Sequence, residues 1–142
     1  MNGFLDSSAL LKLLLADEVG GEDLRSEMDL VGQISTSRLT YVEAHAALAA
    51  ARHSGRVARV EYEAAVADFG RIWESLEVVE LTAEVASDAA SAAESYGLRA
   101  GDAIQLASAR SLDPSVITLI AWDARLRAAA SASGLSCYPP EI

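Results

Sequence analysis

Four acidic residues of this chain stand at positions where an α/β protein can bring carboxylates together. Asp6 and Asp123 each follow a short apolar segment, and Asp102 opens a helical pattern. Glu43 lies within the first turn expected for another helix. In open α/β sheets, ligands bind beyond the carboxyl ends of the strands, near the point where the strand order reverses. We therefore expect the four carboxylates to converge in one acidic pocket.

Such a pocket suits a hard divalent cation, because Mg²⁺ and Mn²⁺ prefer carboxylate oxygens and water as ligands. One or two such ions can activate a water molecule and stabilise the leaving oxygen during phosphodiester hydrolysis. Without a metal, four carboxylates would repel one another, and the pKa of at least one would rise. The pattern predicts a Mg²⁺- or Mn²⁺-dependent nuclease with Asp6, Glu43, Asp102 and Asp123 as catalytic and metal-binding residues.

Helix capping is the alternative explanation for each acid taken alone. Aspartate is a preferred N-cap, because its carboxylate accepts a hydrogen bond from an unpaired amide of the first turn, and all three aspartates can serve in this way. Asp102 and Gln105 have the spacing of a capping box, and Thr40 and Glu43 match its S/T-x-x-E pattern. The metal-site interpretation therefore depends on the four acids together.

Apolar segments that alternate with helical patterns predict the elements that carry these residues. Short apolar stretches predict five strands, at residues 2–5, 31–36, 76–81, 116–120 and 135–138. Ala-rich and amphipathic stretches predict helices at 7–15, 22–30, 40–53, 57–73, 82–96, 102–111 and 123–133. This alternation indicates an α/β fold with a mainly parallel sheet of about five strands flanked by helices. A length of 142 residues without a linker or repeat predicts a single domain, 1–142.

Composition excludes several classes of protein. The net charge of −10 argues against a broad, non-specific nucleic-acid binder, although it leaves room for an enzyme that handles RNA locally. Cys137 is the only cysteine, so neither an internal disulfide nor a cysteine-based zinc site is expected. The longest apolar run near the start is too short for a membrane span, and no signal-peptide pattern is present. We therefore expect a cytoplasmic protein with no membrane association.

Four segments resemble the motifs of PIN domains in their order and spacing, over essentially the whole chain. They are Phe4–Leu10, Leu39–Ala44, Arg99–Ala107 and Trp122–Leu126. Within that family, the chain resembles the VapC toxins of bacterial and archaeal toxin–antitoxin pairs. The resemblance implies a PIN-like three-layer sandwich and a Mg²⁺-dependent endoribonuclease that acts on tRNA or ribosomal RNA. It also implies inhibition by a cognate VapB-type antitoxin and assembly as a homodimer.

The resemblance also assigns roles to residues near the acids. It implies that the four carboxylates form the metal site, and that Ser7 or Ser8 supports the site through hydroxyl hydrogen bonds. Arg99 would approach a phosphate or pair with the pocket. The fourth motif usually has Thr or Ser two residues before its aspartate, whereas this chain has Ala121. That departure leaves the role of Asp123 the least determined of the four.

Other folds with acidic or nucleotide sites fit less well. A response-regulator receiver domain needs a lysine in its C-terminal half, and the only lysine here is Lys12. A phosphatase of the haloacid-dehalogenase type would have a second aspartate where Ser8 stands. The G-x-G-x-x-G motif of dinucleotide-binding domains is absent. A catalytically inactive PIN-like or receiver-like domain that binds Mg²⁺ and serves only in interactions is the remaining alternative.

Two further side chains near the acids have alternative roles. His45 lies two residues after Glu43, so on a helix it points away from that carboxylate, and we expect it to be structural or exposed. Trp122 borders Asp123 and is either a packing residue or a platform on which an RNA base stacks.

Overall fold

A computed structural model describes residues 2–29 and 31–140 of the chain. Within these residues the strands are β1 (Asn2–Leu5), β2 (Ile34–Ser37), β3 (Glu77–Val79), β4 (Ile117–Ile120) and β5 (Ser136–Tyr138). The helices are α1 (Ser7–Leu14), α2 (Gly21–Met28), α3 (Arg38–His53), α4 (Arg59–Ser75), α5 (Ala83–Tyr96), α6 (Ala100–Arg110) and α7 (Ala124–Ala132). None of the described helices is long and apolar enough to cross a membrane.

The five strands form one sheet in the order β3-β2-β1-β4-β5, and every neighbouring pair is parallel. The chain starts in the middle of the sheet, adds β2 and β3 on one side of β1, and then crosses over to add β4 and β5 on the other. The strand order therefore reverses between β1 and β4, whose ends are in register at Leu5 and Ile120. Residues that follow these two strands lie where open α/β sheets bind ligands.

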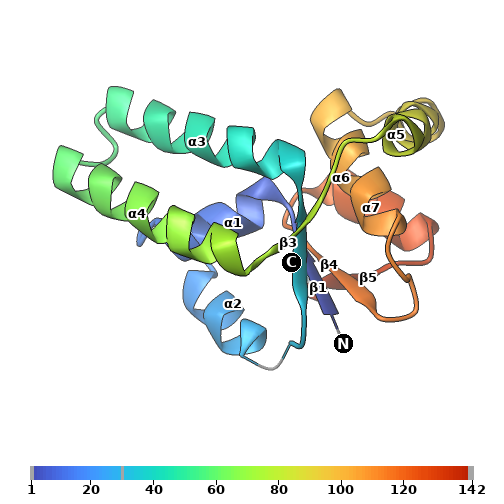
Figure 1. Ribbon diagram of the computed structural model, residues 1–142, viewed down its shortest axis with the longest axis horizontal. Coiled ribbons are helices and arrows are strands. Elements are labelled where there is room, and N and C mark those ends of the chain that lie inside the picture. Colours follow the sequence, from blue (N-terminus) through green and yellow to red (C-terminus); the bar gives the residue numbers. More distant parts are fainter. Residues whose placement is uncertain (1, 30, 141–142) are drawn as a thin grey trace.

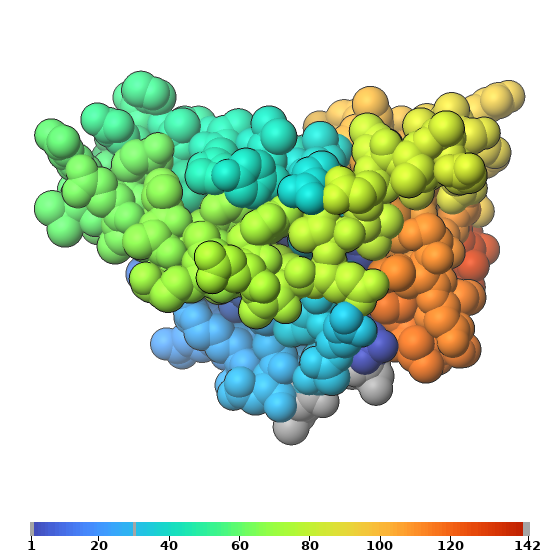
Figure 2. All heavy atoms as spheres, in the orientation of Figure 1, coloured from blue at the N-terminus to red at the C-terminus, as the bar shows by residue number. Residues whose placement is uncertain are grey.

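Helices cover both faces of the sheet, so the predicted three-layer α/β sandwich is confirmed (Figure 1). Helices α1 to α4 lie on one side and α5 to α7 on the other, and Figure 2 shows the two layers as a blue-to-green and a yellow-to-red region. Successive strand residues point to opposite faces. Phe4 accordingly packs with Leu106 and Leu126 on the α6 and α7 side, whereas Leu5 packs with Leu10 and Leu48 on the other. Each such buried side chain contributes roughly 1.5–3 kcal/mol to folding.

Polar side chains at strand ends start several of the helices. Asp6, Ser37, Thr82 and Asp123 are the N-caps of α1, α3, α5 and α7, and each accepts a hydrogen bond from a backbone amide of the first turn. Such a cap stabilises a helix by about 1 kcal/mol. Helix α5 ends at Gly97, which adopts φ +65, a conformation that glycine reaches without strain. The predicted capping by Asp6 and Asp123 is therefore confirmed.

Two other capping predictions are wrong. Helix α3 begins at Arg38 with Ser37 as its cap, so Thr40 lies inside the helix and Glu43 in its second turn, not its first. Strand β2 continues to Ser37, and the Ser37 hydroxyl accepts a hydrogen bond from the amide of Leu39. The helix is therefore capped at Ser37, three residues before Thr40. Helix α6 begins at Ala100, so Asp102 is its third residue and no cap. The S/T-x-x-E and Asp102–Gln105 spacings are thus coincidences of two helices that start earlier.

The remaining helices and strands are of the predicted type, but several of them begin or end at other residues than predicted. Strand β3 is three residues long, because it pairs with β2 only from Ser35 to Ser37. Helix α4 covers Arg59–Ser75 instead of 57–73, because the amide of Val57 bonds back to the carbonyl of Ala51 and is used in the turn. Helix α2 ends at Met28 among the described residues, and the predicted last residue, Leu30, lies outside them.

Candidate active site

Asp6 lies just beyond the end of β1 and is almost fully buried, with 5% of its surface exposed. Its Oδ1 accepts hydrogen bonds from the amide of Ala9 and the hydroxyl of Ser8, both at 2.8 Å. Burial raises the pKa of Asp6 to about 6, against the lowering effect of these two bonds. The negative charges of Asp102 and Glu43 raise this pKa further, so both carboxylates lie within electrostatic reach.

Glu43 reaches the same edge of the sheet from the second turn of α3. Its Oε1 accepts hydrogen bonds from the hydroxyl of Ser7 and from the side-chain amide of Gln105, both at 3.1 Å. Its Oε2 lies over the first turn of α6, where a β-carbon on Gly101 would come within 3.2 Å of it. Glu43 therefore joins α1, α3 and α6 at one point.

Asp102 and Asp123 share a cation. Nη2 of Arg99 lies 3.4 Å from Oδ2 of Asp102 and 3.8 Å from Oδ2 of Asp123. Burial and the charge of Asp123 raise the pKa of Asp102, whereas Arg99 lowers it. The Arg99 side chain is 76% exposed, so both of its ion pairs are weak and Arg99 can readily pair with another anion. Oδ1 of Asp123 is occupied by the amide of Leu126, at 2.9 Å.

The structure therefore brings the four predicted acids, Ser7, Ser8 and Arg99 to one edge of the sheet. Within residues 2–29 and 31–140, no three Asp, Glu, His or Cys side chains are arranged so that they could hold a metal ion. Burial raises the pKa of both Asp6 and Asp102, and the charges of neighbouring carboxylates raise it further.

Arg127 is a supporting residue that the sequence analysis missed. Its guanidinium donates to the carbonyl of Ala121, at 2.9 Å, and to that of Pro139, which ties the turn before Asp123 to the end of β5. The only signal in the sequence is its place one helical turn after Asp123. This pair of bonds supports the corner where the fourth motif lacks a hydroxyl.

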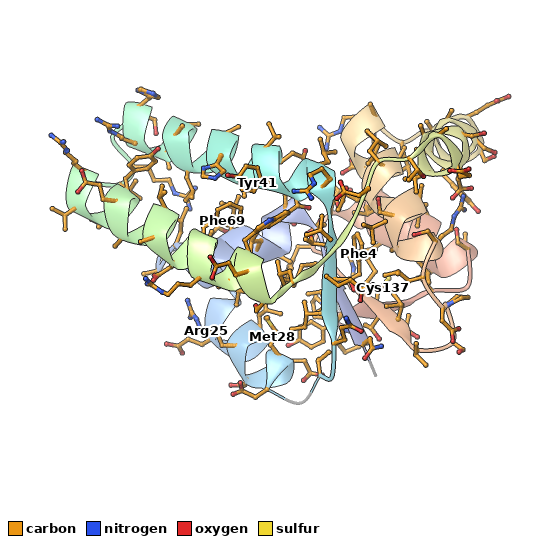
Figure 3. All side chains as sticks on the ribbon, in the orientation of Figure 1. Phe4, Arg25, Met28, Tyr41, Phe69 and Cys137 are labelled. Carbon is orange, nitrogen blue, oxygen red and sulfur yellow. The ribbon has the colours of Figure 1, made fainter. Side chains whose placement is uncertain are left out.

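His45 and Trp122 have packing roles. The ring of His45 contacts those of Tyr41 and Phe69, at centroid distances of 4.7 and 4.8 Å. Figure 3 shows Tyr41 and Phe69 between α3 and α4. The prediction that it is structural is confirmed. Trp122 is half-buried, with its ring against Tyr138 and under the ammonium group of Lys12. These contacts favour the packing interpretation of Trp122 over the stacking one.

Lys12, the only lysine, also has a packing role. Its Nζ donates to the carbonyl of Val19 at 2.8 Å and lies 4.7 Å from the centre of the Trp122 ring. A receiver domain would direct its lysine to the acidic pocket, whereas this one is used in packing the loop before α2. The receiver-like alternative therefore has no candidate for its essential cation among the lysines of the chain, since Lys12 is the only one.

Comparison with known proteins decides the family. The model of the PIN domain matches residues 3–131, which is most of the chain. The chain belongs to the PIN-domain family. Two curated proteins of Mycobacterium tuberculosis, Ribonuclease VapC45 and Ribonuclease VapC49, are each 36% identical to it over 141 residues, with 98% of this chain and 96% of the relative covered. The resemblance inferred from the four motifs is thereby confirmed.

Solved PIN structures have the same architecture. The chain superposes on PAE2754 from Pyrobaculum aerophilum with a TM-score of 0.69 and 23% identity, over 96% of this chain and 89% of that one. It superposes on VapC20 of M. tuberculosis, described as a sarcin-ricin loop cleaving toxin, with a TM-score of 0.68 and 20% identity, over 94% and 95%. At these identities the likeness shows the fold. PIN-domain ribonucleases are generally dependent on divalent metal ions.

Proposed function

We propose that this PIN-domain protein is a metal-dependent endoribonuclease that hydrolyses RNA phosphodiester bonds and acts as the toxin of a VapBC-type toxin–antitoxin pair. The observation that carries the proposal is the meeting of Asp6, Glu43, Asp102 and Asp123 beyond the ends of β1 and β4. The 36% identity to two ribonucleases over nearly the whole chain supports RNA cleavage as the reaction. These four acids are the proposed catalytic and metal-binding residues.

The donor set fits Mg²⁺, with Mn²⁺ as an alternative. All the proposed ligands are carboxylate oxygens, which hard divalent cations prefer, and no cysteine or histidine takes part. Burial raises the pKa of Asp6 and of Asp102, and the charges of neighbouring carboxylates raise both further, which a bound cation would offset. When bound, the metal stabilises charge on the phosphate oxygens and lowers the pKa of a water molecule beside them.

The protein's own groups orient the acids and the substrate. Ser8 and the amide of Ala9 hold Asp6, and Ser7 holds Glu43, so that each carboxylate has a defined orientation. Arg99 is the exposed cation at the mouth of the site. We propose that it leaves the aspartates when a metal binds and then contacts a substrate phosphate, for which guanidinium geometry is suited.

The net charge of −10 argues against binding of RNA through a broad basic face. Structured RNA is recognised through shape and through unpaired loops, which needs only local contacts. We therefore propose a folded RNA, tRNA or ribosomal RNA, as the substrate. We propose the cytoplasm as the location of the protein, because tRNA and ribosomes are found there.

A VapB-type antitoxin is the proposed partner, and a homodimer the proposed assembly. Solved structures with the same fold include a toxin–antitoxin complex from Klebsiella pneumoniae, at a TM-score of 0.67 and 17% identity, over 99% of both chains. An antitoxin encoded next to this chain would keep the ribonuclease inactive until needed.

Three measurements test this function. Purified protein should cleave RNA with Mg²⁺ or Mn²⁺ and stop when EDTA is added. Sequencing of RNA ends after controlled expression should then locate the cleaved sites. Cleavage that continues in EDTA would refute the metal dependence, and no cleavage with either metal would favour the inactive binding domain. A separate pull-down should recover the small protein encoded immediately upstream, and its failure to bind would refute only the toxin assignment.

A further inference from the structure

Gln105 is a large polar side chain in the interior, with 2% of its surface exposed. It comes from the second turn of α6 and reaches across to α3. Its Nε2 donates to the hydroxyl of Thr40 at 2.9 Å and to Oε1 of Glu43 at 3.1 Å. Both hydrogens of the amide nitrogen are therefore used on α3, and one of the two bonds ends on a proposed metal-binding carboxylate.

The chemistry of Glu43 fixes which way this amide points. An ionised carboxylate only accepts hydrogen bonds, so the nitrogen of Gln105 must face it. Its oxygen, Oε1, then points the other way, where it is buried and has no hydrogen-bond partner among the described residues. An unpaired buried carbonyl oxygen destabilises the folded state. An apolar residue of similar size would avoid this cost, so the glutamine is unfavourable for the fold alone.

Residues that lower the stability of the fold are concentrated at functional sites. We propose that Gln105 is a positioning residue for Glu43. Gln105 and Ser7 hold Oε1 from two sides, and Thr40 anchors Gln105. This clamp leaves Oε2 of Glu43 directed over Gly101, beside Asp102. The inference rests on the proposed function, because it concerns the same acidic pocket.

The test uses the full chain and the substitution Gln105→Met, which keeps the volume and removes the hydrogen bonds. Groups that orient metal ligands typically change metal affinity or activity by about 10–100-fold. We expect the Kd for Mn²⁺, measured by calorimetry, to rise about tenfold and kcat for RNA cleavage to fall by at least as much. KM for RNA should stay within about twofold. The Tm of the metal-free protein should stay close to that of the wild type, because the substitution removes the unpaired Oε1 but also the partner of the buried Thr40 hydroxyl.

Ser108 supplies a matched control on the same helix. Its hydroxyl is also buried and has no hydrogen-bond partner among the described residues, so it forms no hydrogen bond with a proposed site residue. Ser108→Ala should leave Mn²⁺ binding and kcat at the wild-type level, with an equal or higher Tm. If Gln105→Met fails to fold, Thr40→Val, which removes the anchor, should give the same loss of Mn²⁺ affinity and kcat.

Three results would overturn the inference. Wild-type Mn²⁺ affinity and kcat in Gln105→Met would show that Glu43 needs no clamp. A loss of both together with a large fall in Tm would show a structural role only. An equal loss in Ser108→Ala would show that the helix, not the amide, matters. Failure of the proposed function is distinguishable, because then the wild-type protein itself neither cleaves RNA nor binds Mn²⁺.

Discussion

Asp6 and Asp123 follow the adjacent strands β1 and β4, and each caps the next helix through its Oδ1. Among the described residues, the capping hydrogen bonds use only Oδ1 of each aspartate. Oδ2 of each is therefore left for the pocket. In Asp123 this oxygen faces Arg99. Capping and metal binding are therefore compatible roles of the same side chain, because the cap itself aims the second oxygen.

Asp6 should make the metal-free protein less stable as the pH rises. Its pKa in the folded state is about 6, above the ordinary value of 3.8, so the fold favours the protonated form. The fold is unaffected by Asp6 below pH 3.8, loses stability as the pH rises to about 6, and stays at the lower level above that. The shift corresponds to about 3 kcal/mol at most.

Asp6→Asn keeps an oxygen for the cap and removes the charge. Urea unfolding of both proteins in EDTA should give similar free energies of unfolding near pH 4 and a more stable variant above pH 6. A variant that is less stable than the wild type at pH 7 would show that the buried charge of Asp6 is not a cost to the fold.

Gly101→Ala should lower activity without harming the fold. The new β-carbon would lie 3.2 Å from Oε2 of Glu43, so the carboxylate has to move by a few tenths of an ångström. Displacement of a catalytic group on this scale costs about tenfold in kcat. Gly70→Ala in α4 is the control, because its β-carbon meets nothing within 4 Å. The control should keep full activity and gain about 0.5–1 kcal/mol of stability. Equal activity in the two variants would contradict the close approach of Glu43 to Gly101.

Arg99→Gln should affect metal and RNA in opposite directions. Loss of the cation beside Asp102 and Asp123 should lower the Kd for Mn²⁺, by at most about fivefold because Arg99 is exposed. KM for RNA should rise, since a phosphate contact is lost, and the change should shrink at high salt. Arg59→Gln, at an exposed pair with Glu63 on α4, is the control for a general change of charge. A KM equal to that of the control variant would refute the phosphate contact.

Arg127→Met should destabilise the protein by about 1–2 kcal/mol, because two carbonyl groups lose a charged donor. Thermal unfolding measures this effect directly. Arg125→Met, two residues earlier on the same helix and exposed, should change the free energy of unfolding by less than about 0.5 kcal/mol. Equal stability of both variants would mean that Arg127 does not hold the turn at Ala121.

The sequence predicted the ends of β1 and β4 well, because a short apolar segment followed by Asp6 or Asp123 is a local signal. It also placed the four acids on elements that meet. The starts of α3 and α6 were misjudged, because S/T-x-x-E and similar spacings occur by chance inside helices. Ser37 caps α3 because β2 extends to it, and at Ser37 that strand pairs with Val79 of β3, far away in the sequence.

The resemblance to PIN domains implied that Ser7 or Ser8 supports the site, but the partners of the supporting side chains could not be predicted from local patterns. Gln105 and Glu43 are 62 residues apart, and Ser7 and Glu43 are 36 apart, so only the packing of α6, α3 and α1 brings them together. A local pattern contains no information on such a contact. The acids were found because their chemistry requires a cluster, whereas glutamine and serine have many other uses.

We propose that the four acids form one catalytic metal site. RNA cleavage by purified Asp102→Asn at saturating Mg²⁺, with circular dichroism and Tm as controls of the fold, tests it most directly. We predict a loss of at least about a hundredfold in kcat with the fold intact, since one carboxylate ligand of the site is removed. Cleavage by Asp102→Asn at the wild-type rate would contradict the account.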